Sequence, residues 1–290
     1  MSILIDVIAL AIIAVTAIIG YKRGFVRYVI KLAGTIACVI FALIVSDMAS
    51  EPIYRNIVAP RLESAISDEM KDFDITADVR KSMEQTGIKL DMTDAELKKI
   101  LSDTGSIPTA FERAALDSGK SKEEAEKLRV QTDIYFSDSF GKLILNCAGF
   151  DNADELGSKL DISSAKAFDL VRAFTAKDGI AKGVEYIVKN VVDKMITTII
   201  RYVLFLVLFI LAEALLAVVF TVAGVFDHLP IIKGANKSLG LALGIVKGVL
   251  YVILAALIIS ALCENGAISN SDMFKEPLLF GKLFGLFYKM

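Results

Sequence analysis

The sequence predicts an all-α integral membrane protein with four transmembrane helices and an extracytoplasmic all-α domain inserted between the second and third of them. Two observations lead to this prediction. The 290 residues are 55% hydrophobic, which exceeds the usual share in soluble globular domains. The apolar residues also gather in four runs, each long enough to cross a hydrocarbon core of about 30 Å as a helix.

Charge divides the chain in the same way. Residues 47–194 carry 21 Lys and Arg against 28 Asp and Glu, a net charge of −7. The rest of the chain carries 11 Lys and Arg against 6 Asp and Glu. We therefore expect four parts: a first transmembrane helix pair at 1–46, a polar helical extracytoplasmic domain at 47–194, a second transmembrane helix pair at 195–263 and an amphipathic tail at 264–290.

The first apolar run covers residues 3–19 and is interrupted only by Asp6 and Thr16. A cleaved signal peptide carries its basic residues before the apolar run and a small-residue cleavage site after it. Here the basic residues follow the run. We therefore expect a transmembrane helix that is retained.

A basic cluster precedes the second run, which covers residues 25–46. Short loops rich in Lys and Arg stay on the cytoplasmic side of a membrane. We therefore expect the first turn to be cytoplasmic, and the N-terminus and the polar segment to be outside. The residues that determine this topology are Lys22, Arg23, Arg27 and Lys31.

The fourth run, residues 239–263, carries glycines at every fourth position in its first half: Gly240, Gly244 and Gly248. Glycine is a poor helix former, but small residues at this spacing let two membrane helices pack closely. A second small-residue face in the second run is the partner that we expect for these glycines. It consists of Gly34, Cys38 and Ala42.

The polar segment shows apolar residues at helical spacing among its charges, which favours amphipathic helices over strands. Two helix starts have the pattern of a capping box, Thr93 with Glu96 and Ser121 with Glu124. Pro108 suits a first helical turn.

Two charged residues lie deep inside the third and fourth apolar runs. Glu213 lies in the third run, residues 195–226, and Lys247 is the only charge of the fourth. The two runs are joined by a short loop, so their helices are expected to be antiparallel neighbours, and we predict an intramembrane charge pair. Such a pair can be functional. Alternatively it sets the helix register, or the lysine extends to the headgroups.

The tail is polar to Lys275 and then amphipathic, with leucines and phenylalanines gathered on one side. It is too short to span a membrane. Two placements remain open: a helix in the outer membrane interface, or a helix packed on the polar domain.

Several positions together resemble the colicin V production protein (CvpA) family of bacterial inner-membrane proteins. They are Asp6, the RGFVR run at 23–27, and the later block formed by Leu229, Pro230, Asn236, Leu239, Gly240, Gly244, Lys247 and Gly248. The resemblance covers the two membrane pairs, under half of the chain. It implies a role in toxin production or secretion and in envelope maintenance, in the cytoplasmic (inner) membrane. It implies nothing about residues 47–194.

The residues disfavour most enzyme and cofactor classes. The only histidine, His228, lies in the second short loop, so the polar segment cannot hold a Ser-His-Asp triad. Three dispersed cysteines suggest neither a disulfide framework nor a zinc site. No nucleotide-binding glycine motif occurs, and the basic residues do not resemble a nucleic-acid surface. We expect no catalytic residues, no metal and no cofactor.

Three functions remain, of which an enzyme on the outer face is the least favoured, because the chain has a single histidine. The first is a non-enzymatic membrane scaffold or accessory protein, whose partners are the lipid bilayer and an envelope protein or a second copy of the chain. The alternative is an oligomeric pathway for a small solute or ion that uses Glu213.

Overall fold

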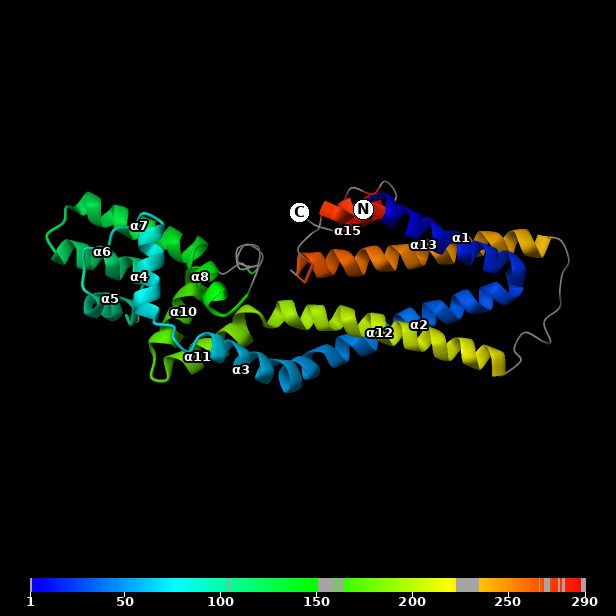
Figure 1. Ribbon diagram of the computed structural model, residues 1–290, viewed down its shortest axis with the longest axis horizontal. Coiled ribbons are helices and arrows are strands. Elements are labelled where there is room, and N and C mark those ends of the chain that lie inside the picture. The colour runs from blue at the N-terminus through cyan, green and yellow to red at the C-terminus, as the bar shows by residue number, and fades with distance from the viewer. Residues whose placement is uncertain are drawn as a thin grey trace. The chain divides into compact units, whose positions relative to one another are not determined.

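All regular secondary structure in the part of the chain that the structure describes is helical (Figure 1). The computed structural model describes residues 2–103, 105–150, 160, 164–222, 235–265, 267–268, 272–275, 277 and 280–287, and these residues contain no strand. The all-α prediction is thereby confirmed for them. The second short loop, with His228, Leu229, Pro230 and Lys233, lies outside the described residues.

The chain divides into two compact units. The membrane unit comprises Met1–Ile53 and Thr197–Met290, and the polar unit comprises Tyr54–Ile196. The sequence places these boundaries at 46/47 and 194/195. The difference has a simple cause, because backbone hydrogen bonds continue the second helix through the polar residues that follow its apolar run.

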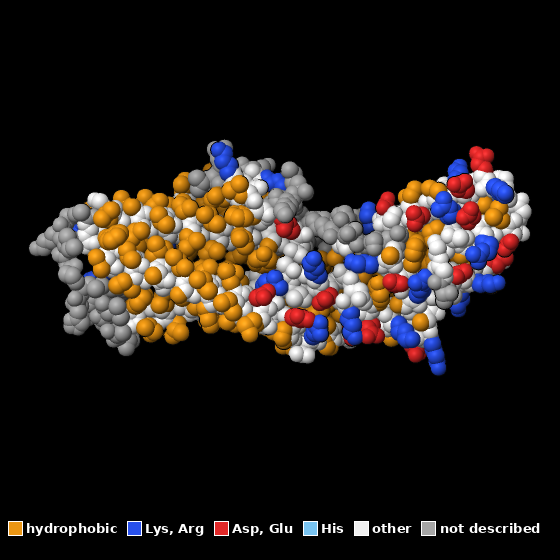
Figure 2. Space-filling view, turned by 180° about the vertical axis from the view of Figure 1, so that it is seen from behind, with side chains coloured by type: hydrophobic (Ala, Val, Ile, Leu, Met, Phe, Trp, Pro, Cys, Tyr) orange, Lys and Arg blue, Asp and Glu red, His pale blue; other side chains and the backbone are white. Residues whose placement is uncertain are grey.

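Four helices of the membrane unit are long and apolar enough to cross a membrane, as the sequence predicts. They are α1 (Ser2–Arg23), α2 (Phe25–Ile53), α12 (Asp193–Val222) and α13 (Ala235–Glu264). Their outward side chains are apolar, and Figure 2 shows these side chains gathered over this unit. Leu211 and Leu215, for instance, are 60% and 65% exposed. Such a surface is stable only against lipid or another apolar partner.

The tail packs within the membrane unit, and its expected position in the outer membrane interface stays a prediction. It forms the short helices α14 (Asp272–Lys275) and α15 (Phe280–Phe287). Phe280 and Phe284 are buried in one cluster with Ala9 of α1 and with Val252 and Ala256 of α13. The apolar side of α15 thus covers side chains of two membrane helices.

The polar unit is a helical domain with its own core. Phe136 and Phe140 are fully buried in this core, with ring centroids 5.1 Å apart. The ring of Phe168, which is half-buried, lies 5.5 Å from that of Phe136. Its helices and two π-helical turns are η1 (Tyr54–Val58), α3 (Ala59–Glu69), α4 (Ile75–Gln85), α5 (Asp94–Leu101), α6 (Ile107–Asp117), α7 (Lys122–Asp138), α8 (Phe140–Cys147), α10 (Ser164–Thr175), α11 (Gly179–Tyr186) and η2 (Ile187–Val191).

Local sequence signals set several of these helix starts. The capping box of Thr93 with Glu96 begins α5, and that of Ser121 with Glu124 begins α7. Pro108 occupies the first turn of α6. These three predictions are confirmed. Each needs only residues within one helical turn, which is why sequence reasoning succeeds here.

Candidate functional site

The glycines of α13 bring two membrane helices together at their backbones. A Cβ atom built on Gly244 would lie 2.6 Å from the Cα atom of Ala17, and one on Gly248 would lie 2.7 Å from that of Ile13. Gly240 faces Gly20 in the same way. As the residue number rises along α13 it falls along α1, so the two helices are antiparallel. No side chain larger than hydrogen fits at these crossings without displacing a backbone.

The partner of these glycines is therefore α1, and the expected pairing with the small-residue face of α2 is wrong. That face meets other side chains instead. A Cβ on Gly34 would lie 2.6 Å from Leu216 Cδ2 of α12. Ala42 is fully buried beside Phe205 of α12 and Ile258 of α13. The physical reason is that α1 carries its own small residues at matching heights, whereas α12 fills the space at α2 with large side chains.

The structure brings Glu213 and Lys247 together inside the membrane unit. Lys247 Nζ lies 3.6 Å from Glu213 Oε2, and the two side chains are 11% and 24% exposed. The ammonium also lies over the Tyr251 ring, 5.1 Å from its centroid, an arrangement that favours a cation. The charges thus come from facing positions of α12 and α13.

The carboxylate of Glu213 is only partly satisfied. Its second oxygen, Oε1, is buried and has no hydrogen-bond partner within the described part of the chain. A buried carboxylate oxygen without a donor is costly. The arrangement can therefore hold the helix register, or accept a water molecule or a cation.

The basic residues of the first turn gather at one end of the membrane unit. Lys22 and Arg23 end α1, while Arg27 and Lys31 lie in the first two turns of α2. The start of α13 lies at this same end, because Lys237 Nζ is 5.7 Å from the centroid of the Tyr21 ring. The last turns of α12 lie there too, because Lys31 Nζ is 5.9 Å from the centroid of the Phe220 ring. The ends that the two short connections join are therefore on one side of the unit.

Two contacts of residues distant in sequence were not anticipated. Asn236 Oδ1 of α13 accepts a hydrogen bond of 2.5 Å from the backbone N–H of Phe25 and so caps α2. Gly24 makes the preceding turn with φ +78°. Asp6 Oδ1 of α1 accepts a 2.9 Å bond from the backbone N–H of Phe280 at the start of α15. The only signal in the sequence is that Asn236 and Asp6 are polar residues in membrane helices, where such residues usually make a specific contact.

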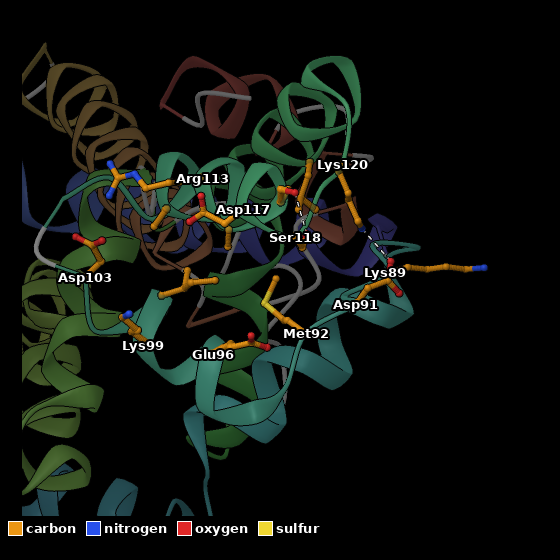
Figure 3. Close-up of a pocket in the computed structure, with 15 residues that line it drawn as sticks. Lys89, Asp91, Met92, Glu96, Lys99, Asp103, Arg113, Asp117, Ser118 and Lys120 are labelled. Carbon is orange, nitrogen blue, oxygen red and sulfur yellow. Dashed lines mark hydrogen bonds and ion pairs between the residues drawn. The ribbon is translucent and has the colours of Figure 1, made fainter.

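A recess opens in the polar unit between α5, α6 and the turns that flank them (Figure 3). Its volume is about 380 Å³. The buried side chains of Ile100, Ala110, Ala115 and Leu128 line it together with Met92, and charged side chains surround it. Sequence reasoning missed this recess, because its charged residues individually resemble a solvated helix surface.

Residue types that bind metal ions do not cluster in the described part of the chain. The described residues include no group of three or more His, Cys, Asp and Glu side chains that could hold a metal ion. The cysteines Cys38, Cys147 and Cys263 are all unbridged.

Comparison with known proteins identifies no relative. No family model, no curated protein and no solved structure matches the chain. The geometry of the two units is therefore the basis for assigning a function.

Proposed function

We propose that the chain is a CvpA-like membrane scaffold, in which four transmembrane helices anchor a polar helical unit that binds a protein of the cell envelope. The observation that carries this proposal is the recess in a helical unit with its own core, inserted between two pairs of membrane helices. Binding in such a recess needs no reacting group, because an apolar floor and surrounding charges are sufficient for recognition.

Contacts at the positions of the family resemblance support the anchoring role. Asn236 caps α2, Asp6 caps α15, and the glycines of α13 pack on α1. These residues hold the helices of the membrane unit to one another. A rigid anchor is what a scaffold requires.

The proposal includes a direction in the membrane. The basic cluster at the first turn favours a cytoplasmic position for both short connections. Because each of the four helices crosses the membrane once, the polar unit and both termini are then extracytoplasmic. The host membrane in this proposal is a bacterial inner membrane.

Photo-crosslinking in native membranes tests the scaffold function. A photoreactive phenylalanine analogue placed at Met92, at Lys71 or at Ile134, which is 55% exposed on α7, samples three parts of the polar unit. We expect at least one of these positions to give a discrete, light-dependent adduct with one protein. We expect no protein adduct from Leu211, which is 60% exposed on α12. The absence of any protein adduct from the polar unit would contradict the proposal.

One observation favours a second function, an oligomeric pathway for an ion or small solute. Glu213 Oε1 is buried without a hydrogen-bond partner among the described residues, and a permeating cation or water molecule would provide one. Flux into liposomes that contain the purified protein measures this activity. On this alternative the flux is present and Glu213→Gln abolishes it, whereas the scaffold function predicts no flux for either protein.

A further inference from the structure

The two ends of the membrane unit differ in charge. The two short connections and the helix ends that they join, residues 20–31 and 214–240, carry six Lys and Arg against one Asp, a net charge of +5. This is the basic end. The opposite end has charges of both signs that pair with each other, since Arg201 Nη2 of α12 lies 2.9 Å from Asp47 Oδ1 of α2. Positive charge is therefore in excess at the basic end.

The fold gathers the cations of three helices at the basic end. Gly24 makes the turn between α1 and α2 with φ +78°. Asn236 Oδ1 accepts a hydrogen bond from the backbone N–H of Phe25, which holds the start of α13 against that turn. The cations that these contacts bring to one place are Lys22 and Arg23 of α1, Arg27 and Lys31 of α2, and Lys237 of α13.

Two of these cations occupy positions that a helix disfavours. Arg27 is the third residue of α2 and Lys237 is the third residue of α13, and neither helix has an acidic residue in its first turn. The N-terminus of a helix carries a partial positive charge, which disfavours a cation and favours an anion. Arg27 and Lys31 are also four positions apart on one helix, a spacing at which like charges repel. A bound anion would therefore stabilise both helix starts.

The cations are accessible at the level where a membrane helix meets phospholipid headgroups. The side chains of Lys22, Arg23 and Lys237 are exposed. Lys237 Nζ lies 5.7 Å from the centroid of the Tyr21 ring, which is 45% exposed, and tyrosine is typical of this level. One turn further into the membrane the exposed side chain is apolar, because Ile18 is 53% exposed.

A phospholipid with a negatively charged headgroup matches both features of this surface. Its phosphate oxygens can accept charge-assisted hydrogen bonds from lysine and arginine, and its acyl chains can cover exposed apolar side chains such as Ile18. A soluble anion would contact the cations alone. Clusters of Lys and Arg at the end of a membrane helix attract anionic lipids for these reasons.

We propose that the basic end binds the headgroup of an anionic phospholipid. The phosphate accepts hydrogen bonds from the cations of α1, α2 and α13, and the acyl chains lie along the apolar side chains one turn further into the membrane. Setting the orientation of the chain requires only that these cations stay on one side. Binding a lipid is an additional role, and a lipid reaches this end whichever side of the membrane it faces.

Quenching by brominated lipids tests the proposal, because the chain contains no tryptophan. Tyr21→Trp places a single fluorophore at the basic end. Phe41→Trp, at a 53% exposed position further along α2, is the matched control. The full-length protein is reconstituted in phosphatidylcholine vesicles with increasing fractions of brominated phosphatidylglycerol or of brominated phosphatidylcholine.

For Tyr21→Trp we expect half-maximal quenching at an about three-fold lower mole fraction of brominated phosphatidylglycerol than of brominated phosphatidylcholine. For Phe41→Trp the two lipids should quench equally. Equal quenching of Tyr21→Trp by the two lipids would overturn the proposal, and so would the same preference for phosphatidylglycerol in Phe41→Trp.

Removal of single cations locates the site. In the Tyr21→Trp protein, Arg23→Gln and Lys237→Gln should each reduce the preference for phosphatidylglycerol to about half or less. Quenching by brominated phosphatidylcholine should not change, which shows that the variants are folded and inserted. Lys282→Gln, which removes an exposed lysine of α15 outside the basic end, is the matched control. An equal loss of preference in this control would contradict the assignment.

Two further outcomes separate the lipid from other ligands and from the scaffold function. Glycerol phosphate that abolishes the preference would assign the basic end to soluble phosphate esters and overturn the lipid proposal. A preference that persists in its presence supports the lipid. Equal quenching by the two lipids together with a protein adduct from the polar unit would remove the lipid site and leave the scaffold standing. The reverse pair of results would contradict the scaffold and support the lipid site.

Discussion

Gly244→Leu is expected to destabilise the membrane unit by about 3 kcal/mol. The reason is the close approach of α13 to α1, where even a Cβ atom at Gly244 would lie 2.6 Å from the Cα atom of Ala17. The obstructing atom belongs to a backbone, so it cannot rotate away. Thermal unfolding in detergent measures the effect, and the midpoint should fall by several degrees or more.

The same geometry predicts that Gly244→Ala is also destabilising, though less than leucine, because its single methyl group already overlaps α1. Gly285→Ala on α15 is the matched control, since a Cβ atom there meets nothing within 4 Å. It should leave the midpoint nearly unchanged. A leucine variant that unfolds at the same temperature as the unmodified protein would mean that these glycines face lipid.

The second large effect concerns the charge pair inside the membrane unit. Glu213→Gln and Lys247→Met should each cost about 3 kcal/mol, because each leaves one charge in a low-dielectric site without its partner. The two atoms lie 3.6 Å apart, so the double variant should recover part of the loss. A coupling energy of about 1 kcal/mol or more is expected in the double-mutant cycle.

Strict additivity of the two substitutions would show that the charges do not stabilise each other in the folded protein. Glu213 would then need another partner, and Lys31 is the next candidate, because its Nζ lies over the Phe220 ring of the same helix α12, 5.9 Å from the centroid. That result would favour the pathway function over the scaffold.

Sequence reasoning reached the parts of the structure that depend on local or additive signals. Four apolar runs give four long helices, because hydrophobic length is a property of each run by itself. The pairing of Glu213 with Lys247 follows from a short loop and from depths in the two helices that differ by no more than a lysine side chain can bridge. Capping boxes need only one helical turn.

Sequence reasoning failed where a helix could pack against more than one neighbouring helix. Small residues occur in both α1 and α2, and spacing does not say which of them the glycines of α13 contact. Asn236 acts on a backbone N–H group 211 positions away in the chain, which periodicity cannot indicate. The recess depends on how α5 and α6 meet, and its lysines and aspartates have the composition of any solvated surface.

We propose that the four helices cross a membrane with the basic end of the membrane unit inside the cell and the polar unit outside. Labelling of single cysteines tests it most directly, with Lys22→Cys and Lys122→Cys placed one at a time in a background without Cys38, Cys147 and Cys263. A membrane-impermeant maleimide applied to intact spheroplasts should modify residue 122 at once and residue 22 only after permeabilisation. Modification in the reverse order, or of both residues without permeabilisation, would contradict the account.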